Sequence, residues 1–211
     1  MTDTLIGLRL QDFLGHLASD DPTPGGGSAS ALAAASAASL VEMVARLTTG
    51  RVKFAEVEGE MTEVLRVAPG LRRELAALVD RDTQAFDAVM AAMRLPRETD
   101  EQKEARRQAI EAATKEAARV PLRVVELACE VLALARVVAE KGNPNAITDA
   151  GVAGRLALAG AEGAALNVLV NLPGLRDETF REETRRRCGE VLDLARSTAK
   201  AVAGTVERRM A

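Results

Sequence analysis

Two segments of helix length are almost free of charge, and they constrain the fold more than any other feature. Residues 26–49 contain only Glu42 and Arg46 as charged side chains, spaced to pair along a helix. Residues 151–171 contain only one Arg and one Glu. A helix that is apolar on nearly all sides must be covered by other helices, so both segments are predicted as central helices of a bundle. The first segment is long enough to span a membrane, but its Ala, Ser and Gly residues have too little hydrophobicity to prefer lipid.

The rest of the sequence predicts further helices and no sheet. Ala, Leu, Arg and Glu dominate, and alternating β-branched residues are nearly absent. We expect helices over roughly 4–18, 28–49, 51–95, 99–141 and 148–171, and a last one after Pro173-Gly174. Pro69-Gly70 should kink or split the third helix, and Pro121 could begin a separate helix within the fourth. With no linker or repeat, the prediction is one all-α, multihelical domain over residues 1–211. Its apolar helices need more cover, which favours a homodimer.

Charge and composition narrow the class of function. The net charge of −3 and the lack of Trp and Tyr argue against binding of nucleic acid. Cys129 and Cys188 are far apart, and no signal peptide is recognised at the N-terminus. We therefore expect two reduced cysteines and a cytoplasmic protein.

A glycine-rich loop precedes the first apolar helix. The run Pro22-Thr23-Pro24-Gly25-Gly26-Gly27-Ser28 leads directly into alanines, so prolines stop any preceding helix and the alanines begin a new one. Unpaired N–H groups at such a helix start suit an anionic or carbonyl oxygen. The loop could equally be a flexible turn with Ser28 as the helix cap. No strand precedes it and the Lys-Ser/Thr of a P-loop is missing, so a nucleotide site is not expected.

An acidic side chain interrupts an apolar helix face in the segment 75–93. Helical phase places Asp82 within an apolar stripe, whereas Asp80 falls on the polar side. The stripe consists of Leu75, Leu78, Val79, Phe86, Val89, Met90 and Met93. An ionised carboxylate is costly in apolar surroundings unless it is paired or its pKa rises. A raised pKa suits a general acid or base, and the alternative is a salt bridge to a buried arginine.

Polar residues also gather at a second place. Asn143, Asn145, Thr148 and Asp149 lie in a loop and the start of the following helix, and Asn167 and Asn171 share one face of that helix. These amides either tie helix ends together or bind the edge of a heterocycle. Asp149 could instead be a first-turn acid favoured by the helix dipole.

Seven segments resemble, in order, those of the cyclodeaminase family. They are Pro22–Ser28, Leu47–Phe54, Val79–Phe86, Arg94–Pro96, Val120–Leu122, Gly142–Asp149 and Gly163–Val168. The family comprises the C-terminal domain of formiminotransferase-cyclodeaminase and free-standing bacterial relatives, some of which act as methenyltetrahydrofolate cyclohydrolases. Arg97 stands where the family has lysine, and Pro69-Gly70 interrupts a helix that is usually continuous.

The resemblance implies a helical homodimer that binds a reduced folate as substrate, with no metal and no nucleotide. It implies closure of 5-formiminotetrahydrofolate to 5,10-methenyltetrahydrofolate with release of ammonia. The resemblance also implies that an aspartate in the segment holding Asp80 and Asp82 moves the proton, and helical phase selects Asp82, with Asp80 in reserve. Gly25, Gly26, Gly27 and Ser28 would hold the pterin or a carboxylate, Lys53 the glutamate tail, and the asparagines Asn143, Asn145, Asn167 and Asn171 the pterin edge. Asp149 is a further candidate for binding the substrate.

Two alternatives remain open at this point. The same pocket could hydrolyse the methenyl compound to 10-formyltetrahydrofolate, with water as nucleophile. If the reaction is instead that of a cyclodeaminase, a separate formiminotransferase could supply its substrate. The chain could instead be a non-catalytic helical dimerisation scaffold, in which Asp82 is salt-bridged and no cleft joins it to the glycine loop.

Overall fold

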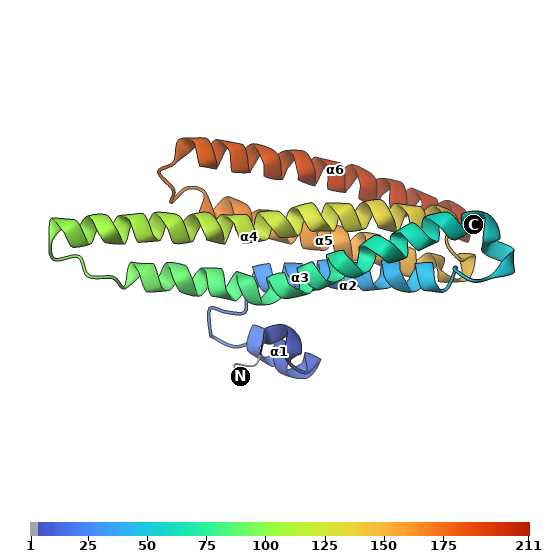
Figure 1. The fold of residues 1–211 in the computed structure, drawn as a ribbon, viewed down its shortest axis with the longest axis horizontal. Helices are drawn as coiled ribbons and strands as arrows, with labels where there is room; N and C mark the ends of the chain where they lie inside the picture. The colour runs from blue at the N-terminus through green and yellow to red at the C-terminus, as the bar shows by residue number, and fades with distance from the viewer. Residues whose placement is uncertain (1–3) are drawn as a thin grey trace.

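A computed structural model describes residues 4–211, and these form a bundle of long helices (Figure 1). The helices are η1 (Leu5–Gly7), α1 (Leu10–Leu17), α2 (Gly26–Arg46), η2 (Val52–Val57), α3 (Glu58–Met93), α4 (Asp100–Lys141), η3 (Pro144–Ala146), α5 (Ile147–Asn171) and α6 (Glu178–Met210). No strand occurs within this range, which confirms the prediction of an all-α bundle.

The two apolar helices, α2 and α5, pack against each other and against α4. Their contact is close because it is built from small residues: a Cβ added at Gly160 would lie 2.8 Å from the Ser30 carbonyl oxygen. α4 also lies within the bundle over its C-terminal half, and it contacts α2, α3, α5 and α6. Both apolar helices meet the length and hydropathy of a membrane span, and about half of each is buried within the bundle. Each keeps one exposed side, so the amphipathic helices do not wrap them completely.

Neither internal proline ends a helix. α3 continues through Pro69 and α4 continues through Pro121, so the predicted split and the predicted new helix start are wrong. A proline removes one backbone hydrogen bond, but the flanking residues hold the helix in place. Ala68 and Leu71 are buried beside Pro69, and Val120 is buried beside Pro121. Tertiary packing therefore outweighs the local preference at both positions.

The N-terminal segment contains less helix than expected. Instead of one helix over residues 4–18, η1 and α1 are separated by Leu8 and Arg9, both in extended conformation. Figure 1 shows α1 standing apart from the bundle, below α2 and α3. The third expected helix also begins later, because residues 52–57 form η2.

The contact of α5 with α6 gives a stability prediction. A Cβ at Gly154 would lie 2.8 Å from Val202 Cγ1, so we expect Gly154→Ala to lower the free energy of unfolding by about 1–3 kcal/mol. Gly189 in α6 has open space around it, so Gly189→Ala should raise that free energy by about 0.5–1 kcal/mol. Urea unfolding followed by circular dichroism measures both. Equal changes in the free energy of unfolding for the two variants would contradict the close packing of α5 on α6.

Candidate functional site

A cavity of 380 Å³ opens where α2 begins, between α2, α3 and α5. The glycine loop forms one wall, an apolar stretch of α3 forms another, and the C-terminal part of α5 closes a third. The lining residues are Pro22, Thr23, Gly25, Gly26, Gly27, Asp82, Ala85, Phe86, Val89, Met90, Met93, Ala117, Asn167, Val170 and Asn171. The structure therefore brings together the predicted glycines, Asp82 and the two asparagines of α5.

Asp82 lies against the N-terminus of α2. Ser28 donates hydrogen bonds to its carboxylate from the backbone N–H and from the hydroxyl, the latter at 3.2 Å. Gly27 is in such close contact that an added Cβ would lie 2.5 Å from Asp82 Cγ and 2.6 Å from Asp82 Oδ2. The helix start that was expected to hold a substrate oxygen thus holds the protein's own carboxylate. Only glycine at position 27 permits this approach.

The environment of Asp82 suits a group that changes its protonation state. Burial raises the pKa of the Asp82 carboxyl, and the hydrogen bonds from Ser28 oppose that rise. The Ser28 hydroxyl also donates to the Val79 carbonyl oxygen at 2.9 Å, so its single proton has two acceptors. It can donate to an ionised Asp82, or donate to Val79 and accept from a protonated Asp82. Either form of the carboxyl is therefore hydrogen-bonded.

Asn167 and Asn171 lie opposite Asp82, at the C-terminal end of α5. The amide nitrogen of Asn167 donates to the Gly163 carbonyl oxygen at 2.9 Å. That of Asn171 donates to the carbonyl oxygens of Asn167 and Ala117, at 2.8 and 3.0 Å. These bonds fix both side chains, and neither amide oxygen has a partner within residues 4–211. The pair therefore presents acceptors to the cavity.

Asp80 has a different role from the one held in reserve for it. Its carboxylate accepts a hydrogen bond from the Leu5 backbone N–H at 2.5 Å, and it does not line the cavity. It fixes the N-terminal segment to α3, so the structure does not place it as a proton carrier at this site.

Four predicted residues lie at the other end of the bundle. Asn143 is buried and joins the end of α2 to the start of α5: its backbone N–H donates to Thr48 Oγ1 and its amide nitrogen to the Leu47 carbonyl oxygen. Its amide oxygen accepts from the Asn145 backbone N–H. Asn145 and Lys53 are exposed and Asp149 is half-buried. α2 has 21 residues and separates them from the cavity by about 30 Å. Within one chain they do not complete the site around Asp82.

The apolar wall of the cavity was not foreseen as part of the site. Phe86, Val89, Met90 and Met93 follow the helical phase of a core stripe, yet they continue α3 past the point where α2 begins. Phe86 and Met93 are consequently 36% and 47% exposed. The signal available in the sequence was the apolar stripe extending beyond its partner helix.

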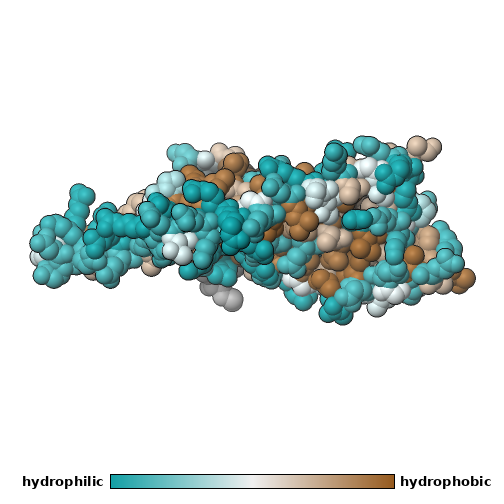
Figure 2. All heavy atoms as spheres, turned by 90° about the horizontal axis from the view of Figure 1, so that it is seen from above, coloured by the Kyte–Doolittle hydropathy of each residue, from teal (hydrophilic) through white to brown (hydrophobic). Residues whose placement is uncertain are grey.

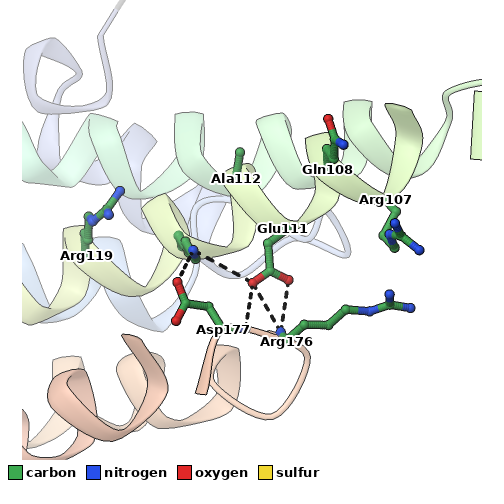
Figure 3. A pocket seen from close by; sticks show the side chains of 8 residues that line it. Arg107, Gln108, Glu111, Ala112, Arg119, Arg176 and Asp177 are labelled. Carbon is green, nitrogen blue, oxygen red and sulfur yellow. Dashed lines mark hydrogen bonds and ion pairs between the residues drawn. The ribbon is translucent and has the colours of Figure 1, made fainter. Parts of the chain in front are cut away.

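A larger cavity of 490 Å³ lies between α4 and the loop that joins α5 to α6 (Figure 3). Its polar groups largely satisfy one another. Glu111 accepts from the backbone N–H groups of Arg176 and Asp177, and Lys115 contacts Asp177 at 2.6 Å. This cluster holds the loop against α4, which gives it a structural role.

We expect Glu111→Ala to lower the free energy of unfolding by about 1–3 kcal/mol, because it leaves two backbone N–H groups without their acceptor. Glu104→Ala, also on α4, removes an exposed ion pair with Arg107 and an exposed hydrogen bond from the Gln108 amide, and should cost less than about 1 kcal/mol. Thermal unfolding at neutral pH compares the two. A loss in Glu111→Ala no larger than in Glu104→Ala would show that the loop does not depend on this carboxylate.

Comparison with known proteins shows the family of this chain. The model of a family described as formiminotransferase-cyclodeaminase matches residues 9–190. The chain belongs to the formiminotransferase-cyclodeaminase family. This confirms the family resemblance.

Several relatives of the formiminotransferase-cyclodeaminase family can be aligned along nearly the whole chain. A methenyltetrahydrofolate cyclohydrolase of Methylorubrum extorquens is 46% identical over 95% of this chain and 97% of its own length. The formimidoyltransferase-cyclodeaminase of Rattus norvegicus is 32% identical over 98% of this chain, which spans 38% of that protein. The crystal structure of formiminotetrahydrofolate cyclodeaminase from Thermotoga maritima matches with a TM-score of 0.87 and 30% identity, covering 97% of this chain and 98% of that one.

Membership of this enzyme family disagrees with a non-catalytic scaffold, and so does the site. A scaffold predicts a salt-bridged Asp82 and no cleft beside the glycine loop. Asp82 makes no salt bridge with any residue in the described part of the chain, and the cavity joins it to Gly25, Gly26 and Gly27.

Proposed function

We propose that this chain hydrolyses 5,10-methenyltetrahydrofolate to 10-formyltetrahydrofolate. The observation that carries the proposal is the 46% identity, over nearly the full length of both chains, to a protein named methenyltetrahydrofolate cyclohydrolase. The sequence-based prediction placed the cyclodeaminase reaction first and hydrolysis second. The match to a cyclohydrolase of similar length reverses that order.

The cavity supplies the groups that hydrolysis requires. The apolar wall of α3, from Phe86 to Met93, would cover the flat pterin, and the amide oxygens of Asn167 and Asn171 would accept from its N–H groups. Asp82 is the one carboxylate among the lining residues, which supports its assignment as the proton carrier of the reaction.

Hydrolysis then follows in two steps. The oxygen of a water molecule adds to the methenyl carbon while ionised Asp82 takes a proton from that water. The products of this step are a tetrahedral carbinolamine and a protonated Asp82. The bond from that carbon to N5 breaks, N5 receives the proton of Asp82, and the hydroxyl proton passes to solvent as the formyl group forms on N10. The net change is addition of one water and release of one proton.

A second candidate is the cyclodeaminase reaction, favoured by the structural match to the Thermotoga maritima enzyme. There N10 would attack the carbon of the protonated formimino group, Asp82 would take the N10 proton, and the resulting amino group would receive that proton and leave as ammonia. The site geometry serves both reactions, because each needs one proton carrier beside the same carbon.

One assay separates the two candidates. Purified protein is mixed with 5,10-methenyltetrahydrofolate, and the near-ultraviolet absorbance of that compound is followed with a buffer control. The absence of Trp and Tyr keeps the protein's own absorbance low. We expect enzyme-dependent loss of the band and formation of 10-formyltetrahydrofolate. If the protein instead forms the band from 5-formiminotetrahydrofolate with release of ammonia, and does not speed its loss, the cyclodeaminase is the correct assignment.

A further inference from the structure

The cavity that contains Asp82 extends towards the tip of the hairpin formed by α3 and α4. Its lining residues on α3 run from Asp82 to Met93, which span about 16 Å along the helix axis. The cavity therefore has a polar end at Asp82 and an apolar arm, formed by residues 86–93 of α3, that points towards the hairpin tip. In the view of Figure 2, hydrophobic side chains gather over the wide part of the molecule, whereas the narrow end formed by the hairpin is hydrophilic.

α4 runs beside the apolar arm and leads to the same place. Ala117 of α4 lines the cavity at its polar end. Ala113, Ile110 and Arg106 precede it at intervals of three or four residues, so they lie on the same side of α4. Ala113 and Ile110 are half-buried, which agrees with their position next to α3. The side of α4 that begins at the cavity thus ends at an arginine.

The guanidinium group of Arg106 lies at the outer rim of the cavity. Its Nε and Nη2 donate to the carbonyl oxygen of Met93 at 3.2 and 2.9 Å, and Met93 lines the cavity. Arg106 has no ion pair with any residue between 4 and 211, whereas the next residue, Arg107, pairs with Glu104. A guanidinium has five N–H donors, so the edge formed by its two terminal nitrogens is still available for a carboxylate.

The charge of the cavity is incomplete for a reduced folate. This substrate consists of a pterin, an aryl ring and a glutamate that carries two carboxylates. No Lys, Arg or His is among the residues that line the cavity, so a cation for these carboxylates must come from its rim. With the reacting carbon beside Asp82, the aryl ring and the glutamate extend away from the pterin, along the apolar arm.

We propose that Arg106 binds a carboxylate of the substrate's glutamate at the rim, while the apolar arm covers the aryl ring. The side chain then selects substrates that carry an anionic group at this distance from the pterin. Met93 holds the guanidinium in place through its carbonyl oxygen, which lowers the loss of side-chain freedom on binding. This inference rests on the proposed function for the identity of its ligand.

Arg106→Gln tests the assignment. Glutamine keeps a donor for the Met93 carbonyl oxygen and removes the charge, so the fold should be retained. We expect KM for 5,10-methenyltetrahydrofolate to rise by about 10-fold or more, with kcat within about two-fold of wild type, because the glutamate is bound equally in the ground state and the transition state. Arg106→Lys keeps the charge without the planar fork and should give an intermediate KM.

Arg107→Gln is the matched control, because it removes the same charge from the next position on α4. Arg107 lines the other cavity, between α4 and the loop that joins α5 to α6, so its replacement should leave KM unchanged. An equal rise of KM in the two variants would show that only the net charge of the hairpin matters, and the proposal would be wrong.

A binding measurement keeps the test independent of either reaction. Tetrahydrofolate and its analogue that ends in an uncharged amide in place of the glutamate are titrated into the protein in a calorimeter. Wild type should bind tetrahydrofolate about 10-fold more tightly than the amide, and Arg106→Gln should bind the two compounds equally. If Arg106→Gln weakens both compounds by the same factor, the arginine only stabilises the hairpin and does not bind the glutamate.

The outcomes also separate this inference from the proposed function. If wild type hydrolyses the methenyl compound but binds the amide as tightly as tetrahydrofolate, the proposed function stands and the inference is wrong. If wild type acts on neither folate substrate but shows the expected preference, which Arg106→Gln abolishes, only the proposed reaction is contradicted. A protein that binds neither compound contradicts both.

Discussion

Asp82→Asn should lower turnover of 5,10-methenyltetrahydrofolate by about two orders of magnitude or more, because it removes the proton carrier from the cavity. Asparagine has a similar shape and can still accept from the Ser28 backbone N–H, so the fold should be retained. Stopped-flow measurement of kcat for both proteins gives the ratio. Asp80→Asn is the matched control: it weakens only the contact with Leu5 and should keep turnover within a few-fold of wild type. A larger loss in Asp80→Asn than in Asp82→Asn would reverse the assignment.

The same replacement should stabilise the protein at neutral pH. Burial raises the pKa of Asp82 in the folded state above its unfolded value. Between those two pKa values the folded state binds more protons than the unfolded state, so stability falls as pH rises through this window. The Asp82→Asn protein lacks the carboxyl and therefore does not lose stability in this way. The Tm of Asp82→Asn should therefore exceed that of wild type at pH 7, and the difference should shrink as the pH falls towards the unfolded pKa. A lower Tm at pH 7 would show that the carboxylate stabilises the fold.

Gly27→Ala should also lower activity strongly, through the displacement of the Asp82 carboxylate. The added Cβ would lie 2.6 Å from Asp82 Oδ2 and 2.5 Å from Cγ, so the carboxylate must move away from the start of α2. We expect turnover to fall by about 100-fold and the free energy of unfolding by about 1–3 kcal/mol.

Gly70→Ala is the control for Gly27→Ala, since Gly70 lies in α3 with open space around it. It should leave turnover unchanged and stabilise the helix by up to about 1 kcal/mol. Normal turnover in Gly27→Ala would mean that the close contact between α2 and Asp82 is not required for the reaction.

Helical periodicity predicted the parts of the site that depend on one helix. It separated Asp82 from Asp80, and the structure places only Asp82 in the cavity. It also placed Asn167 and Asn171 on one side of α5, where both line the same cavity. These predictions hold because residues three or four apart on a helix share a face whatever surrounds it.

Other features depend on contacts between distant parts of the chain, which periodicity does not encode. Asp80 binds the backbone of Leu5, 75 residues away, so its role could not be read from α3 alone. Asn143 donates hydrogen bonds to Leu47 and Thr48, directly after α2, and so lies at the other end of the bundle from Asp82. Pro69 and Pro121 were expected to break helices because local preference was weighed without the packing that holds them. Which ends of the helices meet is set by tertiary structure.

The measurement that tests the central claim most directly is the pH dependence of kcat/KM on 5,10-methenyltetrahydrofolate. If ionised Asp82 starts the reaction, the rate should rise with pH through a limb whose apparent pKa lies above the ordinary value of 3.8 for an aspartate. The residual rate of Asp82→Asn should lack that limb. A limb that persists unchanged in Asp82→Asn would contradict the account, because another group would then carry the proton.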